Sequence, residues 1–595
     1  MLSHKHLITR NRISQVSNSR GKNHSNRHAA VLVCSAAVIA ISAIFGAVAT
    51  DASTINWSST AGTAGWETAT NWSSDTVPGV ADVAAFDSTS YTNQPILGSD
   101  IPNSNASVSG LAFGDGTTAA AALTIAASTS SEATSGTTLS GSSTINLAAI
   151  GTQNVGEELA GTGIVSGTVI TGITGSQVTI SSPTTAVINS GTSLTFSPTL
   201  TIGSSGVTVS GSTSNSSLTT VQIISAPVVL GTSQAWENNS ISSTNALIAE
   251  NVFIGANQTL TLNAVTKGFN NPAFEFDGQN SISGAGTLKI SSGVAELGAT
   301  SSGAAGNPGF TGNIVVEAGG TVVAYGSGNG SGSSVDLLGT GTLIINGGTI
   351  GFNGNLNGTS NSHGLLGGTE VWNADFATNN YGKTVYMGTG AISLGTVAGG
   401  SAVRTITSGN NFGGGNTVFG GAISNGVTAT GLNITGPGIV TLDGANTYTG
   451  PTTVSKDSQG AGKLVVNGSL ENSNITIVAG GTLEGTGTLN WNLAGNTGNL
   501  ITAAGTLNIT SLNLALNITG TQTLSQYVVA DYSGGTLTGT AFASVTGLPA
   551  GWSINYNDGS EIVLNVAPVP EPAALGLMAG AGAGILLVGR KRKRA

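Results

Sequence analysis

Few residues in this chain have the types and spacing that catalysis by paired carboxylates requires. The acidic candidates are Glu157 with Glu158, Glu275 with Asp277, and Asp336. Cleavage of a glycosidic bond uses two carboxyl groups about 5 to 10 Å apart, one as the acid and one as the base or nucleophile. Glu275 and Asp277 are two residues apart in an expected strand, so both should point to the same face. An enzyme would therefore use this pair.

Basic residues do not gather around these carboxylates. Polysaccharide lyases generally bring cationic side chains to the uronate, whereas the basic residues of the central chain are scattered. We therefore expect no enzymatic activity and no catalytic residue. A carbohydrate-active enzyme, either a polysaccharide hydrolase or a lyase, is the alternative. The scattered residues are Lys267, Lys289, Lys383, Arg404, Lys456 and Lys463.

Histidine and cysteine are nearly absent from the central chain. Of the five His, only His363 lies beyond the first 28 residues, so a Ser-His-Asp triad could use no other histidine. The single Cys, Cys34, lies in an apolar run near the N-terminus. A lone thiol forms no internal disulfide and no thiolate metal site. We expect no metal site and no cofactor.

Two turns are rich in oxygen atoms that could coordinate calcium. They span Asp443 to Asn446 and Asn555 to Asp558. Neither has the spacing of an EF-hand or of a Gly-Gly-x-Gly-x-Asp array. Asn and Asp are also the residues that tight turns favour, and we prefer that interpretation. The many Gly-x-Gly patterns carry no nucleotide signal, because a chain with 90 glycines contains them by chance.

Short β-strands must position these residues, and the clearest strands lie between 436 and 489. Residues 438–442 read Gly-Ile-Val-Thr-Leu, and residues 463–466 read Lys-Leu-Val-Val. Such alternation, interrupted by Gly and Asn, is typical of half-buried strands joined by tight turns. A similar pattern occurs at 284–290 and 310–316. Strand-turn units in series predict a solenoid, in which each unit buries its apolar face against its neighbours.

Residues 436–464 resemble the autotransporter-associated β-strand repeat, also called the passenger-associated transport repeat. They match its Gly-x-Gly-x-Leu-x-Leu strand, its Gly-x-Asn-Thr-Tyr-x-Gly-x-Thr segment and its Gly-x-Leu end. Residues 284–325 match it more loosely, with Phe310 in place of the tyrosine. The resemblance implies an all-β protein, a right-handed parallel β-helix that is exported from the cell. It implies no enzymatic activity.

The composition agrees with a narrow β-solenoid. Gly accounts for 90 of the 595 residues, and only 7% of the residues are charged. Such a chain is too poor in charge for classical disorder and too poor in Leu, Lys and Glu for a helical protein. About 500 residues could stack roughly 20 turns at a strand spacing of ~4.8 Å.

Charge is distributed unevenly along the chain. The residues between the two basic ends carry 27 acidic and six basic side chains, a net charge of −21. Such a surface repels nucleic acid and anionic lipid. We therefore expect no nucleic-acid partner.

The N-terminus has the organisation of a signal peptide. The first 28 residues are basic and lack acidic side chains, and residues 29–49 are apolar and end in Ala47-Val-Ala49. A positive segment, an apolar segment and an A-x-A end form the pattern that signal peptidase cleaves. We predict cleavage between Ala49 and Thr50, with cleavage after Ala52 as the alternative. An uncleaved anchor is the other interpretation, because the apolar run could just span a bilayer.

The body of the protein is expected to comprise four regions. Residues 50–127 form an N-terminal cap and the first strands. Residues 128–200 combine a Ser/Thr/Gly-rich loop, 128–140, with a small all-β insertion, and residues 201–520 form the solenoid. Residues 521–567 carry bulkier apolar side chains, which predict a C-terminal β-cap over the last turn.

Three tryptophans gather in the expected N-terminal cap. They are Trp57, Trp66 and Trp72. Solenoids need a cap to cover the open end of the first turn, and large aromatic side chains are suited to that role. We favour the cap over the alternative, an exposed aromatic platform for carbohydrate.

The C-terminal tail, residues 568–595, is the most specific signal in the chain. Pro570-Glu571-Pro572 precedes an apolar run at 573–589 and a basic end. An apolar run of this length is at the lower limit for a transmembrane helix, and the basic cluster would stop transfer. Together these parts resemble the PEP-CTERM sorting signal, which implies processing by an exosortase near Pro-Glu-Pro. An ordinary tail anchor is the alternative. The basic residues are Arg590, Lys591, Arg592, Lys593 and Arg594.

These patterns predict an exported structural or adhesive protein of the cell surface or extracellular matrix. The C-terminal helix would hold it in the membrane until processing. Signal peptidase and exosortase are the expected partners during export, and extracellular polysaccharide is a candidate partner afterwards. The second alternative is an autotransporter passenger-like adhesin. A true autotransporter would end in a membrane β-barrel, whereas this chain ends in an apolar run and Arg-Lys residues.

Overall fold

The fold is given by a computed structural model, in which the described chain is a right-handed β-solenoid of about 16 turns with almost no helix. This confirms the predicted all-β, parallel β-helical architecture. Two short 3-10 helices, η1 (Ala69–Asn71) and η2 (Ser73–Asp75), lie near its start. The structure describes residues 52–567 except 59, 116–120, 211–220, 241–245, 266–270, 279, 300–305, 327–335, 355–364, 381, 410–413 and 472.

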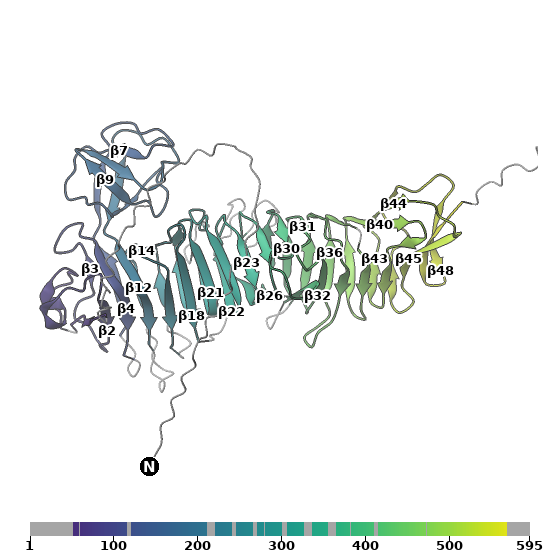
Figure 1. Ribbon diagram of the computed structural model, residues 1–595, viewed down its shortest axis with the longest axis horizontal. Helices are drawn as coiled ribbons and strands as arrows, with labels where there is room; N and C mark the ends of the chain where they lie inside the picture. The colour runs from purple at the N-terminus through teal and green to yellow at the C-terminus, as the bar shows by residue number, and fades with distance from the viewer. Residues whose placement is uncertain are drawn as a thin grey trace, which may run out of the picture. The chain divides into compact units, whose positions relative to one another are not determined.

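Each turn contributes up to three short strands, which we call faces 1, 2 and 3 in chain order (Figure 1). Each strand pairs in parallel with the strand of the same face one turn later. Face 1 contains the first parts of β4 (Ala106–Phe113) and β12 (Leu200–Val209), then β14 (Val228–Leu230), β17 (Val252–Phe253), β20 (Ile282–Ser283), β27 (Thr384–Gly388), β30 (Asn416–Phe419), β33 (Ile439–Leu442), β36 (Lys463–Val466), β39 (Thr482–Gly485), β43 (Thr506–Asn508) and β46 (Thr536–Thr538).

Face 2 begins at the N-terminal end and is the longest of the three stacks. It contains β1 (Thr54–Asn56), β2 (Val83–Phe86), the second parts of β4 and β12, β15 (Gln234–Asn238), β18 (Thr259–Ala264), the first parts of β21 (Thr287–Ala299) and β22 (Asn313–Gly326), β23 (Leu343–Asn346), β25 (Glu370–Trp372), β28 (Ile392–Ser393), β31 (Ile423–Ser424), β34 (Ala445–Asn446), β37 (Ser469–Leu470), β40 (Thr488–Ala494), β44 (Asn513–Thr519) and β47 (Ser544–Thr546). β41 (Thr497–Gly498) pairs with β40 in the antiparallel direction.

Face 3 closes each turn. It contains β3 (Ile96–Leu97), β5 (Leu123–Ala127), β13 (Gln222–Ile224), β16 (Leu247–Ala249), β19 (Phe274–Asp277), the second parts of β21 and β22, β24 (Thr349–Gly354), β26 (Phe376–Asn379), β29 (Val403–Ser408), β32 (Gly431–Thr435), β35 (Thr452–Val454), β38 (Ile475–Ile477), β42 (Ile501–Ala503) and β45 (Gln526–Asp531).

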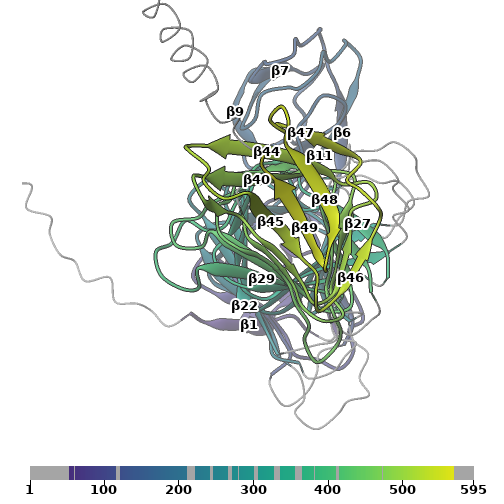
Figure 2. The same cartoon turned by 90° about the vertical axis from the view of Figure 1, so that its right-hand side faces the viewer.

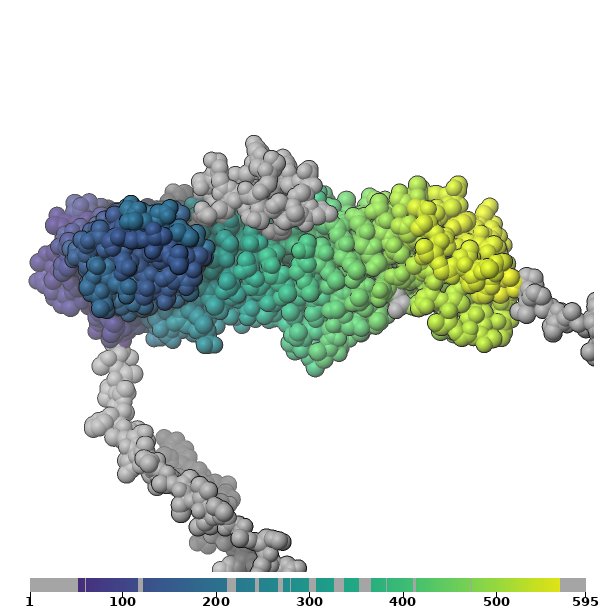
Figure 3. Space-filling model, turned by 90° about the horizontal axis from the view of Figure 1, so that it is seen from above, coloured from purple at the N-terminus to yellow at the C-terminus, as the bar shows by residue number. Residues whose placement is uncertain are grey.

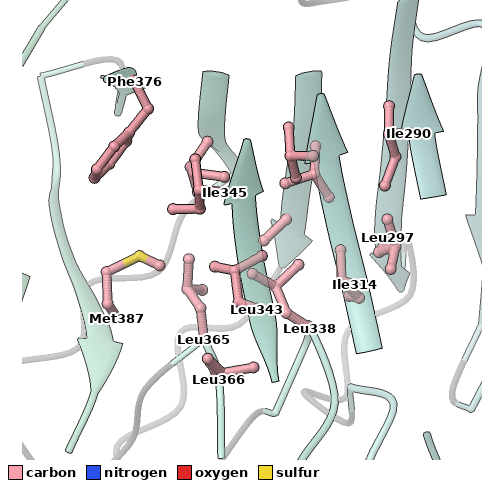
Figure 4. Packing of buried hydrophobic residues seen from close by; sticks show 14 of the residues in the cluster. Ile290, Leu297, Ile314, Leu338, Leu343, Ile345, Leu365, Leu366, Phe376 and Met387 are labelled. Carbon is pink, nitrogen blue, oxygen red and sulfur yellow. The ribbon is translucent and has the colours of Figure 1, made fainter. Parts of the chain in front are cut away.

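Alternation of side chains decides what each strand buries. In β18, Leu260 and Leu262 point inward, whereas the threonines beside them are partly exposed. The parallel register then stacks apolar side chains on one another in successive turns, and Figure 4 shows part of this core. Each fully buried Leu or Ile contributes about 1.5–3 kcal/mol, so stability accumulates turn by turn. One such column contains Leu260, Leu288, Ile314 and Leu343.

A column of glycines runs along the corner between faces 1 and 2. At each position, an added Cβ would overlap the carbonyl oxygen of the glycine one turn earlier. The backbones of successive turns approach closely there, and only a residue without a side chain fits. We call this set the glycine column. Its members are Gly286, Gly312, Gly341, Gly368, Gly390, Gly421, Gly444, Gly468 and Gly487, and the first of them faces the carbonyl oxygen of Gly255.

The tryptophans near the N-terminus close the first turns. Trp57, Trp66 and Trp72 are each at most 2% exposed and pack edge to face, with ring centroids 4.8–4.9 Å apart. The Trp72 indole donates a hydrogen bond to the carbonyl oxygen of Trp66 at 2.7 Å. Trp72 also contacts Phe86 of β2, which joins the cluster to the solenoid core. The alternative of an exposed carbohydrate platform is therefore wrong, because these rings are buried.

A separate module interrupts the solenoid between β5 and β12. It consists of two antiparallel sheets, β7-β10-β9 and β6-β11-β8, around a hydrophobic core of its own. The loop predicted at 128–140 is wrong for the four residues of β6. Because the residues of this module do not stack in the solenoid, the solenoid has about 16 turns and not the roughly 20 expected from the length of the chain. Its strands are β6 (Ser130–Ala133), β7 (Thr144–Asn146), β8 (Glu158–Ala160), β9 (Ile170–Thr174), β10 (Gln177–Ile180) and β11 (Ser193–Ser197).

The C-terminal region contains both the last turn and an antiparallel closure. β46 and β47 continue the parallel stacks of faces 1 and 2. β48 (Ser553–Asp558) and β49 (Glu561–Asn565) form a hairpin, and β49 pairs with β45 in the antiparallel direction. Figure 2 shows this hairpin crossing the end of the solenoid. The stretch predicted as a cap, 521–567, therefore combines solenoid strands with a closing hairpin.

The two stretches compared as repeats occupy different faces. Residues 287–290 belong to face 2, whereas 439–442 belong to face 1. Likewise, 313–316 lie on face 2 and 452–454 on face 3. Residues 284–325 and 436–464, which both resemble the same repeat, therefore differ by one face in their positions within a turn. The shared pattern reflects the strand-and-corner geometry that every face of the solenoid requires.

The predicted signal peptide and sorting tail lie outside the described residues. These include the cleavage residues Ala47, Ala49 and Thr50, the motif Pro570-Glu571-Pro572, and Arg590 to Arg594. Within the part of the chain that the structure describes, no helix has the length and apolar character needed to cross a membrane.

Candidate functional site

A shallow groove of about 240 Å³ lies on the outside of face 1, between β27 and β39. We call it the face-1 groove. The parallel register aligns its lining side chains in rows along the solenoid axis. One row contains Asn416, Ile439 and Lys463, the second contains Tyr386, Val418, Thr441, Val465 and Glu484, and Asp443 and Asn467 follow at the adjoining corner.

Polar contacts between neighbouring turns hold the groove's walls. The Lys463 ammonium lies 2.8 Å from a carboxylate oxygen of Glu484. The Asn467 amide donates a hydrogen bond to the Asp443 carboxylate at 2.9 Å. Each contact joins residues one turn apart, so the side chains are positioned before any ligand arrives.

A second hollow, of about 570 Å³, lies at the C-terminal end between β46 and the β48–β49 hairpin. Tyr532 and Tyr556 line it, together with Leu537 and Asn557. The Tyr532 hydroxyl donates a hydrogen bond to the carbonyl oxygen of Tyr556 at 3.1 Å. Burial raises the pKa of Tyr556. This hollow belongs to the closure of the last turn.

The carboxylates Glu275 and Asp277 do share the outer face of β19, as predicted. Phe274 and Phe276 alternate with them and point into the core. Asp277 also acts on Glu250, whose pKa is raised by burial and further raised by the charge of Asp277. The two candidates therefore sit in an acidic part of face 3.

The other acidic candidates are distributed over different parts of the fold. Asp336 lies in the corner that precedes face 1, two turns after the corner that follows Asp277. Burial raises the pKa of its carboxyl. Its carbonyl oxygen accepts hydrogen bonds from the backbone N–H groups of Asn307 and Gly339. Its backbone therefore serves a corner of the solenoid.

Glu157 and Glu158 lie where the module meets the solenoid. Glu157 is fully buried, and burial raises its pKa to about 7, while the backbone N–H of Asn154 donates to it. Both carboxylate oxygens of Glu158 lie 2.6 Å from the side-chain amide nitrogen of Asn251 in the solenoid. Figure 3 shows the module over the early turns. Glu158 therefore joins the module to the solenoid, and the buried pair presents no open carboxylate face to a substrate.

Sequence reasoning missed a buried carboxylate in the solenoid core. Glu370 points inward from β25 and is 3% exposed. It accepts a hydrogen bond from the Trp372 indole at 2.8 Å, and burial raises its pKa to about 7. The Glu-x-Trp spacing was the available signal, because residues two apart in a strand share a face and tryptophan side chains are largely buried on average.

One residue counted among the scattered basic side chains is also buried. Arg404 is 3% exposed, and its guanidinium donates hydrogen bonds to the carbonyl oxygens of Trp372 and Leu394. Burial lowers its pKa, while the charge of Asp375 acts in the opposite direction. Arg404 therefore secures backbone groups at a corner.

The oxygen-rich turns are used by the solenoid itself. The Asn446 amide is buried; it donates to the carbonyl oxygens of Gly444 and Ser469 and accepts from the N–H of Ile423. Asn555 accepts from the N–H of Asn557 within its own turn. Among the described residues, no three His, Cys, Asp or Glu side chains gather in a way that could hold a metal ion. His363 lies outside the described residues.

The face-1 groove had a sequence signal that went unused. Asp443-Gly and Asn467-Gly each directly follow a strand of face 1. That repetition places Asp443 and Asn467 at the same corner one turn apart. No protein-family model matches the chain, and neither the curated proteins nor the solved structures contain a significant match.

Proposed function

We propose that this chain is an exported cell-surface or extracellular-matrix protein with a structural or adhesive role, sorted by an exosortase system. The observation that most supports this is the tail, where Pro570-Glu571-Pro572 precedes an apolar run and a basic end. The solenoid suits such a role, because about 16 stacked turns offer a long outer surface of repeated hydroxyl and amide groups.

The proposal assigns an order to the export steps. Signal peptidase cleaves between Ala49 and Thr50, and the C-terminal helix then holds the chain at the membrane. Exosortase processes the tail near Pro570 and releases the solenoid to the surface or the matrix. Extracellular polysaccharide is the partner class that the proposal favours there.

Intact-mass measurement of the protein from each cell fraction tests this order. We expect a mature form that starts at Thr50, ends near Pro570, and occurs on the surface or in the medium. Replacing Pro570, Glu571 and Pro572 together by alanine should leave the tail attached and the protein with the cells. Pro568→Ala is the control, because it changes a proline just outside the motif. Finding residues 573–595 attached in every fraction of the native protein would contradict the proposal.

Enzymatic cleavage of polysaccharide is the second candidate, favoured by the shared outer face of Glu275 and Asp277. Our proposal expects the purified protein to release no reducing ends or unsaturated ends from neutral or acidic polysaccharides. Release by the native protein, together with its loss in a folded Glu275→Gln or Asp277→Asn variant, would establish the enzyme instead. An autotransporter passenger-like adhesin would cleave no polysaccharide, and its release from the cell would not depend on Pro570-Glu571-Pro572.

A further inference from the structure

The face-1 groove combines an apolar floor with polar walls. Ile439 and Val465 are the partly exposed aliphatic side chains of this floor, whereas Val418 and Thr441, which line it beside Val465, are only 3% and 4% exposed. Tyr386 adds an aromatic ring at one end of the same row. Aliphatic and aromatic side chains of this kind pack against the C–H faces of pyranose rings, while polar walls orient the hydroxyl groups.

The walls supply hydrogen-bonding groups in fixed positions. Asp443 and Glu484 each offer carboxylate oxygens, and a carboxylate can accept more bonds than the single contact that holds each one here. Asn416 contributes an amide, whose oxygen accepts a hydrogen bond from the Thr441 hydroxyl at 2.9 Å. A ligand with many hydroxyl donors matches a wall in which acceptors predominate.

The charge of the groove narrows the class of ligand. Two carboxylates, Asp443 and Glu484, face one ammonium group, Lys463, and that ammonium is already paired with Glu484. The surrounding chain is strongly acidic as well. A uronate polymer or a nucleic acid would therefore be repelled, whereas an uncharged ligand would meet no electrostatic penalty.

The geometry points to a binding site for a neutral polysaccharide that lies along the solenoid axis in the face-1 groove. Its rows repeat at the strand spacing of about 4.8 Å, so successive sugar residues can meet the successive turns. This inference rests on the proposed adhesive function, for which it names a site and a class of ligand. Because the groove is small, a single site should bind weakly, with a dissociation constant of about 1 mM.

Affinity electrophoresis of the purified, folded protein in gels containing dextran, mixed-linkage β-glucan or polygalacturonate tests the inference, because this method detects weak binding. We expect retardation by at least one neutral polymer and none by polygalacturonate. Tyr386→Ala should raise the dissociation constant obtained from the retardation about tenfold, since aromatic contacts dominate the binding energy of such interfaces. The matched control is Tyr325→Ala, which removes an outward tyrosine from face 3.

Several results would overturn the inference. They are no retardation by any of the three polymers, stronger retardation by polygalacturonate than by the neutral gels, or equal effects of the two tyrosine variants. Loss of binding in Tyr532→Ala with retention in Tyr386→Ala would move the site to the C-terminal hollow. Failure here leaves the export measurements intact, because they follow the tail and not the groove. Conversely, an unprocessed tail would refute the export proposal while groove binding could still stand.

Discussion

Replacing Gly421 by alanine is expected to destabilise the solenoid by about 3 kcal/mol or more. Gly421 belongs to the glycine column, and an added Cβ would overlap the carbonyl oxygen of Gly390 and lie 2.8 Å from its carbonyl carbon. The obstacle is backbone, so no side-chain rotation can relieve it. β28 and β31, which pair at Ile392 and Ile423, would have to separate.

Urea unfolding followed by tryptophan fluorescence measures this loss, and hydrogen exchange of the peptides around 388–424 locates it. Gly62→Ala is the matched control, because no heavy atom lies within 4 Å of a Cβ built at Gly62. We expect the control to change stability by less than about 0.5 kcal/mol. Similar unfolding midpoints for the two variants would show that the turns can separate at this corner without cost.

Strand positions could be predicted from the sequence because the side-chain period in a strand is local. The Ile-Val-Thr-Leu run at 439–442, which is rich in β-branched residues and bounded by glycine, forms β33 as predicted. The face to which a strand belongs could not be predicted, because 287–290 has a similar pattern and lies on another face. That assignment depends on which corner follows, and on contacts between turns that are distant in sequence.

The candidate functional residues were likewise predictable from the sequence only in part. The shared face of Glu275 and Asp277 follows from their two-residue spacing and was predictable. The face-1 groove as a whole was not, because the row from Tyr386 to Glu484 forms only when five successive turns stack in register, and the repeated Asp443-Gly and Asn467-Gly mark only its corner. Residue types alone reveal such a site only after the length of each turn is known.

Glu370 breaks the rule that solenoid cores are apolar, and this exception makes stability depend on pH. Its carboxyl is enclosed by the core, and the Trp372 indole donates one hydrogen bond to it. Burial disfavours the charged form and raises the pKa from 4.5 to about 7. The folded state therefore binds a proton more tightly than the unfolded chain. The stabilisation from that proton is complete below about pH 4.5 and is lost as the pH rises through about 7.

Glu370→Gln should therefore stabilise the protein at pH 8 by about 3 kcal/mol, because the amide keeps an acceptor for Trp372 and carries no ionisable proton. At pH 4.5 the variant and the native protein should have nearly equal unfolding free energies.

Urea titrations at pH 4.5, 6, 7 and 8 measure the difference in unfolding free energy between Glu370→Gln and the native protein. This difference isolates the effect of Glu370 from that of the other buried carboxylates. Glu471→Gln, a change of the same chemistry at a partly exposed position, is the matched control. If the difference between Glu370→Gln and the native protein stays constant across this range, the pKa of Glu370 is the same in the folded and unfolded chains, and Glu370 ionises within the fold. The carboxylate must then be stabilised in its charged form by a partner in the core.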